Sequence, residues 1–180
     1  MHYKQLFELV SLKCLPLVGT FIFYKIYTLI CGEIDKTILM NISIRPLDSK
    51  EIHSVIGLVY KLNNGRISEE ILTDRFNEMV TQNYKCIGVY DNKDLIGVCG
   101  LWFCTRHYAG KSVELDHVYI DEAYRNQGLG KKVMTWINDY VISKGCQSME
   151  LNTYVSNYPS HKFYYNEGME IWGYHFFKRL

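Results

Sequence analysis

Apolar and polar positions alternate with two different periods along most of the chain, and these periods predict a mixture of strands and helices. Residues 42–46 alternate and end at a proline, which is typical of an edge strand. Apolar side chains then recur at helical spacing over residues 52–59, after Asp48 and Glu51 in the arrangement of a capping box. A second helical stripe follows Ser68. The pattern therefore predicts a strand followed by two helices.

The rest of the pattern predicts a hairpin, a long helix and further strands. Two strand-like runs, 86–90 and 95–104, are joined by a short polar loop suited to a hairpin. A long amphipathic helix begins at Leu129 and ends at a basic turn followed by Gly145. The other predicted elements are strands at 112–120, 149–154 and 170–178 and a short helix at 160–166. The predicted order is β-α-α-β-β-β-α-β-α-β, which places the chain in the α/β class.

The first 39 residues differ in character from the remainder. Residues 14–31 are strongly apolar, but Lys25 interrupts them and leaves an uncharged run shorter than the roughly 18 to 20 residues of a membrane span. No small-residue cleavage site follows, so a secretory signal is also disfavoured. Three interpretations of residues 1–39 stay open: a dispensable extension translated upstream of Met40, a packing or dimerising helix, and a membrane anchor. We expect the functional domain to span residues 40–180.

Charge and cysteine usage narrow the classes of function. The 180 residues include 20 basic and 19 acidic side chains, a net charge of +1, which provides no long-range field for nucleic acid. The six cysteines form no C-x-x-C pair, so we expect no metal site and a reducing, cytoplasmic location. The length suits a single core. We therefore expect a one-domain protein without a nucleic-acid partner.

The most informative segment is the glycine-containing loop 125–131, which precedes the long helix. Free amides at a helix start hold phosphate oxygens, and glycines let the backbone come close to them. A dinucleotide-binding turn would need a third glycine, and a P-loop would need Ser or Thr directly after Lys131. Both common phosphate loops are disfavoured. A tight turn that uses glycine only for its backbone freedom remains the alternative.

With its context, this loop resembles motif A of the GNAT acetyltransferases. The R-x-x-G-x-G pattern of Arg125, Gly128 and Gly130 follows a strand, as in that family. A second family motif is matched by Asn157, Ser160, Phe163, Tyr164 and Gly168, with Ser160 in place of the usual Ala and Met169 in place of the usual Phe. The resemblance covers residues 40–180. Within the family, residues 160–164 and 174–180 are most similar to the aminoalkylphosphonate acetyltransferases.

The resemblance implies a GNAT fold, an acetyltransferase activity and acetyl-CoA as the donor. The fold would have a mixed central sheet of about six to seven strands with helices on both faces. Acetyl-CoA would lie where strands 112–120 and 148–154 splay apart, with its pyrophosphate on the glycine-containing loop. The cofactor-binding residues implied are Val118, Tyr119, Ile120, Arg125, Asn126, Gln127, Gly128, Leu129, Gly130, Lys131, Asn157, Ser160 and Tyr164. Asn157 could instead cap the helix that follows it.

Acetyl transfer to an amine needs a base and an acid. An alkylammonium must lose a proton before it attacks a thioester, and Glu114 occupies the base position that the resemblance implies. Asp116 and His117 stay open as alternatives. Strand alternation would place Glu114, Asp116, Val118 and Ile120 on one face unless a bulge intervenes. A thiol has a pKa of about 8.5 and a tyrosine about 10, so a tyrosine can protonate the leaving thiolate, and Tyr164 occupies the general-acid position that the resemblance implies.

The acceptor is expected to be the primary amine of a small molecule. Its pocket would come from the first two helices and residues 102–110. Arg66, Arg75 and Arg106 could hold an acidic acceptor or could be solvated. A protein or peptide amine, a non-catalytic CoA-binding module and a membrane-tethered interaction protein are the alternatives, and assembly into a homodimer stays open.

Overall fold

The computed structural model of the chain describes residues 40–180. The three interpretations of residues 1–39 therefore lie outside the described residues. Between Met40 and Leu180, no helix has the length and apolar character needed to cross a membrane.

The described part follows the predicted order of strands and helices up to its last element. The capping box of Asp48 and Glu51 forms, although it begins a 3-10 helix that continues into the first α-helix. Ser68 caps the next helix by accepting a hydrogen bond from the Ile71 amide at 3.3 Å. The elements are β1 Ile42–Pro46, η2 Ser49–Val55, α3 Ile56–Leu62, α4 Glu69–Met79, β2 Tyr84–Asp91, β3 Asp94–Arg106, β4 Gly110–Ile120, η3 Glu122–Tyr124, α5 Leu129–Ser143, β5 Ser148–Leu151 and α6 Tyr158–Asn166.

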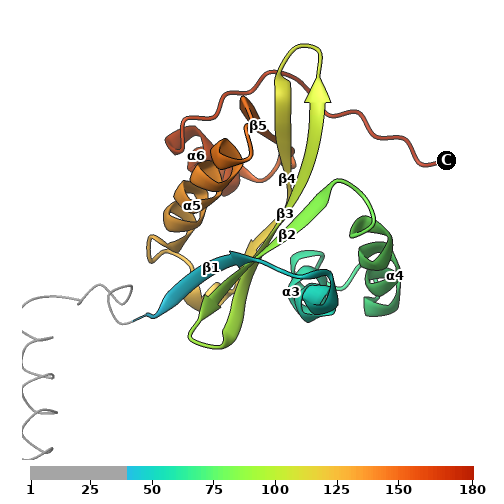
Figure 1. Cartoon of the computed structure of the whole chain (residues 1–180), viewed down its shortest axis with the longest axis vertical. Helices are drawn as coiled ribbons and strands as arrows, with labels where there is room; N and C mark the ends of the chain where they lie inside the picture. Colours follow the sequence, from blue (N-terminus) through green and yellow to red (C-terminus); the bar gives the residue numbers. More distant parts are fainter. Residues whose placement is uncertain (1–39) are drawn as a thin grey trace, which may run out of the picture. The chain divides into compact units, whose positions relative to one another are not determined.

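The strands form one mixed sheet in the order β1-β2-β3-β4-β5. The first three neighbouring pairs are antiparallel, and β4 pairs with β5 in parallel. Helices α3 and α4 lie on one side of the sheet, and α5 and α6 lie on the other (Figure 1). The predicted mixed sheet with helices on both faces is confirmed.

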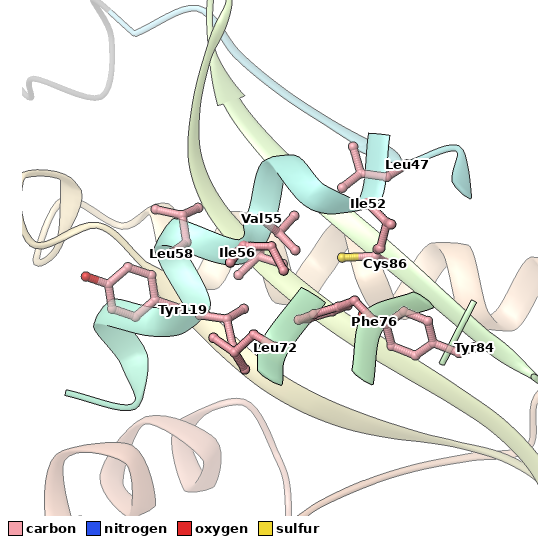
Figure 2. Packing of buried hydrophobic residues seen from close by; sticks show 12 residues of the cluster. Leu47, Ile52, Val55, Ile56, Leu58, Leu72, Phe76, Tyr84, Cys86 and Tyr119 are labelled. Carbon is pink, nitrogen blue, oxygen red and sulfur yellow. The ribbon is translucent and has the colours of Figure 1, made fainter. Parts of the chain in front are cut away.

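Each face of the sheet has its own hydrophobic core. On the α3/α4 face, the Phe76 ring packs against Tyr84, with 6.3 Å between ring centroids, among the apolar side chains drawn in Figure 2. On the other face, α5 buries a stripe of residues four apart, because that spacing keeps side chains on one side of a helix. This stripe consists of Leu129, Val133, Ile137 and Val141. Each fully buried aliphatic side chain contributes about 1.5 to 3 kcal/mol.

The predicted strand at 170–178 is wrong. The sheet of the described residues has five strands, fewer than the six to seven expected, because this segment pairs with no strand. Its large side chains are exposed, with Trp172 at 79% and Phe176 at 91%. In Figure 1 the segment runs from α6 across to the side of the sheet on which α3 and α4 lie. Alternation alone does not make a strand, since a strand also needs an edge to pair with, and β5 offers only four residues.

Candidate active site

The glycine-containing loop begins α5 without a side-chain cap. Gly128 is the N-cap residue at φ 75°, a left-handed conformation that favours glycine, and no side chain caps the helix there. A Cβ atom at Gly128 would meet nothing within 4 Å, so the space beside the helix start is open. The first amides of α5 and the positive end of its dipole are therefore accessible to an anion.

Gly130 has a different role from Gly128. A Cβ atom at Gly130 would lie 3.2 Å from the Phe163 ring of α6, closer than ordinary van der Waals contact. This glycine lets α6 pack closely against the first turn of α5. The two glycines of the motif thus serve two purposes, one conformational and one of packing.

Arg125 ties the loop to the end of β4. Its Nε donates to the Ile120 carbonyl at 2.9 Å, and its guanidinium lies 5.1 Å from the centre of the Tyr119 ring. A further contact of 3.4 Å joins it to Glu122. The side chain therefore braces the strand-to-loop turn. Its phosphate-facing role stays a prediction.

The ladder between β4 and β5 ends well before β4 does. The last pair is Leu115 with Leu151, whereas β4 continues to Ile120. The strand predicted at 149–154 is thus shorter than expected at its end. Within residues 40–180, the β4 edge from 116 to 120 has no strand partner on the β5 side. Its backbone groups on that side are available to an extended ligand.

A bulge in β4 changes which side chains share a face. Asp116 pairs with Gly100, but the next pair is Tyr119 with Val98, so His117 and Val118 together face a single residue of β3. His117 has a φ of 35°. The bulge that the sequence left open is therefore present, and the alternation of Glu114, Asp116, Val118 and Ile120 does not continue beyond Asp116. Val118 and Ile120 pack with the core beneath α5, and Tyr119 is buried in the core of the α3/α4 face.

His117 is held in a network that occupies both of its ring nitrogens. Nε2 lies 2.8 Å from the Tyr84 hydroxyl, and Nδ1 lies 3.2 Å from Asp116 Oδ2. A Cβ atom at Gly100 would overlap the imidazole, so glycine is required beneath it. The side chain is 8% exposed. His117 is therefore poorly placed to take a proton from an acceptor.

Asp116 is a weak base in this network. Burial alone would raise the pKa of its carboxyl group, but the hydrogen bond and attraction of His117 and the hydrogen bond from Trp102 lower that pKa to about 2. The Trp102 indole donates to Oδ2 at 3.3 Å. Of the two alternatives to Glu114, neither offers a free basic group in this arrangement.

Glu114 lies in a polar cluster, which we call the carboxylate cluster: Arg106, Tyr108, Glu114, Glu150 and Asn152. Its Oε2 accepts from Arg106 Nη2 at 2.7 Å, and its Oε1 accepts from Asn152 at 2.7 Å. Arg106 Nε also lies 3.1 Å from Glu150 Oε1. Tyr108 donates its hydroxyl hydrogen to Glu150 Oε2 at 3.1 Å. The Glu114 side chain is 31% exposed, so solvent and ligands can reach it.

The sequence reasoning missed Glu150 and Asn152. Glu150 pairs with Glu114 in the parallel β4–β5 ladder. Both glutamates lie in predicted strands, but a single sequence does not reveal the register of two strands that are far apart in the chain. The proximity of the two glutamates could have been predicted only by combining the acidic residue in each strand with a register known from a related structure.

Tyr164 and Asn157 come from α6 and its start. Tyr164 packs into the core beneath α5, and burial, with a contribution from Cys99, raises the pKa of its hydroxyl to about 12. Asn157 Oδ1 accepts a hydrogen bond from the Ser160 amide at 3.4 Å. Asn157 therefore caps α6, which was the alternative to cofactor binding. Ser160 donates its backbone amide to this cap.

Comparison with known proteins agrees with the fold and the loop. Residues 53–169 match the acetyltransferase (GNAT) family. Over 95 residues the chain is 28% identical to a thialysine N-epsilon-acetyltransferase of Bos taurus, covering 48% of this chain and 55% of that protein. The chain thus spans about half the length of the first curated relatives that it matches. An aminoalkylphosphonate N-acetyltransferase of Salmonella typhimurium is 22% identical over 139 residues, covering 76% of this chain and 90% of that protein.

The fold also matches that of solved enzymes. An aminoglycoside N-acetyltransferase determined in complex with CoA superposes with a TM-score of 0.66 at 18% identity, covering 78% of this chain and 95% of that one. The family match extends from η2 past α6 and so includes the uncapped start of α5, the free edge of β4 and Tyr164. This chain belongs to the acetyltransferase (GNAT) family.

Proposed function

We propose that this chain is an N-acetyltransferase that moves the acetyl group of acetyl-CoA to the primary amine of a small molecule. The observation that carries the proposal is the uncapped start of α5 at Gly128, next in the chain to a β4 edge without a partner. An anion-binding helix start and an open strand edge together suit a ligand with a diphosphate and an amide-containing arm. Coenzyme A has both.

The cofactor would bind along these two features. The amides of residues 129–131 would hold the pyrophosphate, because the space at Gly128 is open and no side chain caps the helix. Backbone groups of Val118 and Ile120 would pair with the pantetheine arm as an added strand does. The Ile120 carbonyl already accepts from Arg125, so its second lone pair would serve this purpose.

The chemistry would use Glu114 as general base and Tyr164 as general acid. Glu114 would take a proton from the acceptor ammonium, directly or through water, and the neutral amine would attack the acetyl carbonyl. As the tetrahedral intermediate collapses, the C–S bond breaks and Tyr164 protonates the departing thiolate, and the second proton that the nitrogen releases balances the one that the tyrosine has given up. Its raised pKa of about 12 keeps the tyrosine in the protonated form that this step needs. Glu114 pairs with Trp102, which packs on the α3/α4 face, whereas Tyr164 packs on the α5 face, so the thioester would react between them at the end of the β4–β5 ladder.

Local charge favours a cationic acceptor. The carboxylates of Glu114 and Glu150 outnumber the one guanidinium of Arg106 by one charge, and Asp116, paired with His117, lies two residues further along β4. Of the three arginines considered for an acidic acceptor, Arg106 is already paired with two carboxylates, so it is not available for that role. Diamines and basic amino acids should therefore be better acceptors than aminophosphonates.

A panel of acceptors tests this proposal. Thiol release from acetyl-CoA would be measured with diamines, basic amino acids, aminoglycosides, aminophosphonates and lysine peptides, and acetylated products would be identified by mass spectrometry. We expect turnover with at least one small amine, and the highest kcat/KM with a diamine or basic amino acid. Turnover with lysine peptides alone would assign a protein acceptor instead. Tight acetyl-CoA binding without turnover would assign a non-catalytic module.

We also propose that the chain forms a homodimer through residues 170–180. The segment exposes the aromatic side chains of Trp172, Tyr174, Phe176 and Phe177. At about 150 to 250 Å² for each fully buried aromatic side chain, and with these four between 77% and 91% exposed, they could bury roughly 500 to 800 Å² per copy. A standard interface buries about 800 Å² on each partner, so the area that these four side chains could bury is comparable with the share of one partner.

A further inference from the structure

In the carboxylate cluster, three of the four carboxylate oxygens accept a hydrogen bond, and the fourth, Glu150 Oε1, lies at ion-pair distance from Arg106 Nε without a hydrogen bond. The two oxygens of Glu114 are held by Arg106 and Asn152, and the two oxygens of Glu150 face Arg106 and Tyr108. One guanidinium thus bridges carboxylates from two neighbouring strands. The cluster lies on the last stretch of the β4–β5 ladder, one pair before the ladder ends.

The register of the β4–β5 ladder places two negative charges side by side, and the Arg106 guanidinium offsets their repulsion. Glu114 and Glu150 are direct partners on adjacent strands, and like charges in that position repel. Arg106 is the last residue of β3, and its planar fork can donate to two carboxylates at once. Its side chain is 34% exposed, so water weakens the attraction without removing it. Each of the three strands at this end of the sheet supplies one charged member of the bridge.

We propose that Arg106, shared with Glu150, is the positioning residue of the general base Glu114. This inference rests on the proposed function. Arg106 and Asn152 fix the Glu114 carboxylate in one orientation and use one lone pair on each oxygen. A carboxylate offers about four such sites, so the others can receive the proton of the acceptor. Because Glu150 also attracts the guanidinium, Arg106 orients the Glu114 carboxylate while its positive charge is shared between the two glutamates.

The proposal predicts opposite changes in the pH profile of kcat/KM for two substitutions. In Arg106→Gln, Glu114 and Glu150 face each other without a cation, so the acidic limb moves to higher pH. In Glu150→Gln, the guanidinium acts on Glu114 alone, so the limb moves to lower pH. We expect each shift to be about half a pH unit or more. The double variant should lie between the two single variants.

Kinetic constants give a second readout. Arg106→Gln should lower kcat by about 10- to 100-fold, because the general base Glu114 loses its fixed orientation. The KM for acetyl-CoA should change less than threefold. Arg106→Lys keeps the charge but not the fork, and it should recover part of the activity. The matched control is Arg45→Gln, which removes a guanidinium–glutamate pair with Glu51 at 2.6 Å on β1 and should leave the pH profile unchanged.

The outcomes separate this inference from the proposed function. If the wild-type protein acetylates no amine, the proposed function fails first. If the wild type is active and both single variants keep its acidic limb, or shift it in the same direction, Arg106 is not the positioning residue. Thermal melting of each variant identifies any loss of folding, and Glu150→Gln, which keeps the shape of the side chain, remains informative if Arg106→Gln does not fold.

Discussion

Individual side chains in this protein take their roles from their hydrogen-bond partners. Glu114, Asp116 and His117 are close in sequence, yet each has a different set of partners: Arg106 and Asn152 for Glu114, Trp102 and His117 for Asp116, and Tyr84 and Asp116 for His117. His117 has both ring nitrogens engaged, and Asp116 has a pKa lowered to about 2. Glu114 is exposed enough to meet a ligand. A choice among the three that the sequence left open thus becomes a proposal with a physical reason.

At this scale, Glu114→Gln should lower kcat by on the order of 10² to 10⁴, because an amide cannot accept the proton of the acceptor. Binding of acetyl-CoA should be almost unchanged. Steady-state kinetics would be compared with Glu51→Gln, a glutamate of η2 that is paired with Arg45 outside the site. Wild-type rates in Glu114→Gln would remove Glu114 from the mechanism.

Tyr164→Phe should also lower kcat by on the order of 10² to 10⁴, since the thiolate would leave without a proton donor. The sign of the pH dependence follows from the raised pKa of about 12. A general acid works while it is protonated, so Tyr164 should cause no loss of activity between pH 7 and pH 10. Tyr165→Phe, on the exposed neighbour, is the control. Equal rates in the two variants would contradict the assignment.

The elements show how far the sequence alone could lead. Helix periodicity and capping residues located α4 and α5, because those signals are local in the chain. The faces of β4 and the role of Glu150 could not be predicted, since they depend on a bulge at His117 and on a register between distant strands. The prediction of a final strand was wrong for a related reason. Alternation at 170–178 describes the side chains but not the availability of an edge.

Substitutions of Gly128 and Gly130 test the separate roles of the two glycines at the start of α5. Gly128→Val should weaken acetyl-CoA binding and also strain the backbone, because φ is 75° there and the open space would be filled. Gly130→Val should lower the melting temperature by displacing Phe163. Titration calorimetry and thermal melting would be run on both variants. Equal losses of affinity in two equally stable variants would contradict the separate roles.

For the whole molecule, the exposed C-terminal segment determines the expected assembly. Removing residues 170–180 should convert a dimer into a monomer, because the aromatic side chains of that segment would be lost. Light scattering coupled to size exclusion, at several concentrations, measures this directly. A substitution on the exposed face of α4, Glu70→Gln, is the control. A full-length chain that stays monomeric at high concentration would contradict the dimer.

The central claim is that the uncapped start of α5 holds the diphosphate of coenzyme A. Isothermal titration of the folded full-length chain with CoA tests it most directly. We predict one site with a dissociation constant in the micromolar range, weakened at least tenfold in Gly128→Val, which corresponds to about 1.4 kcal/mol of binding free energy. A well-folded wild-type protein that shows no binding of CoA would contradict the account.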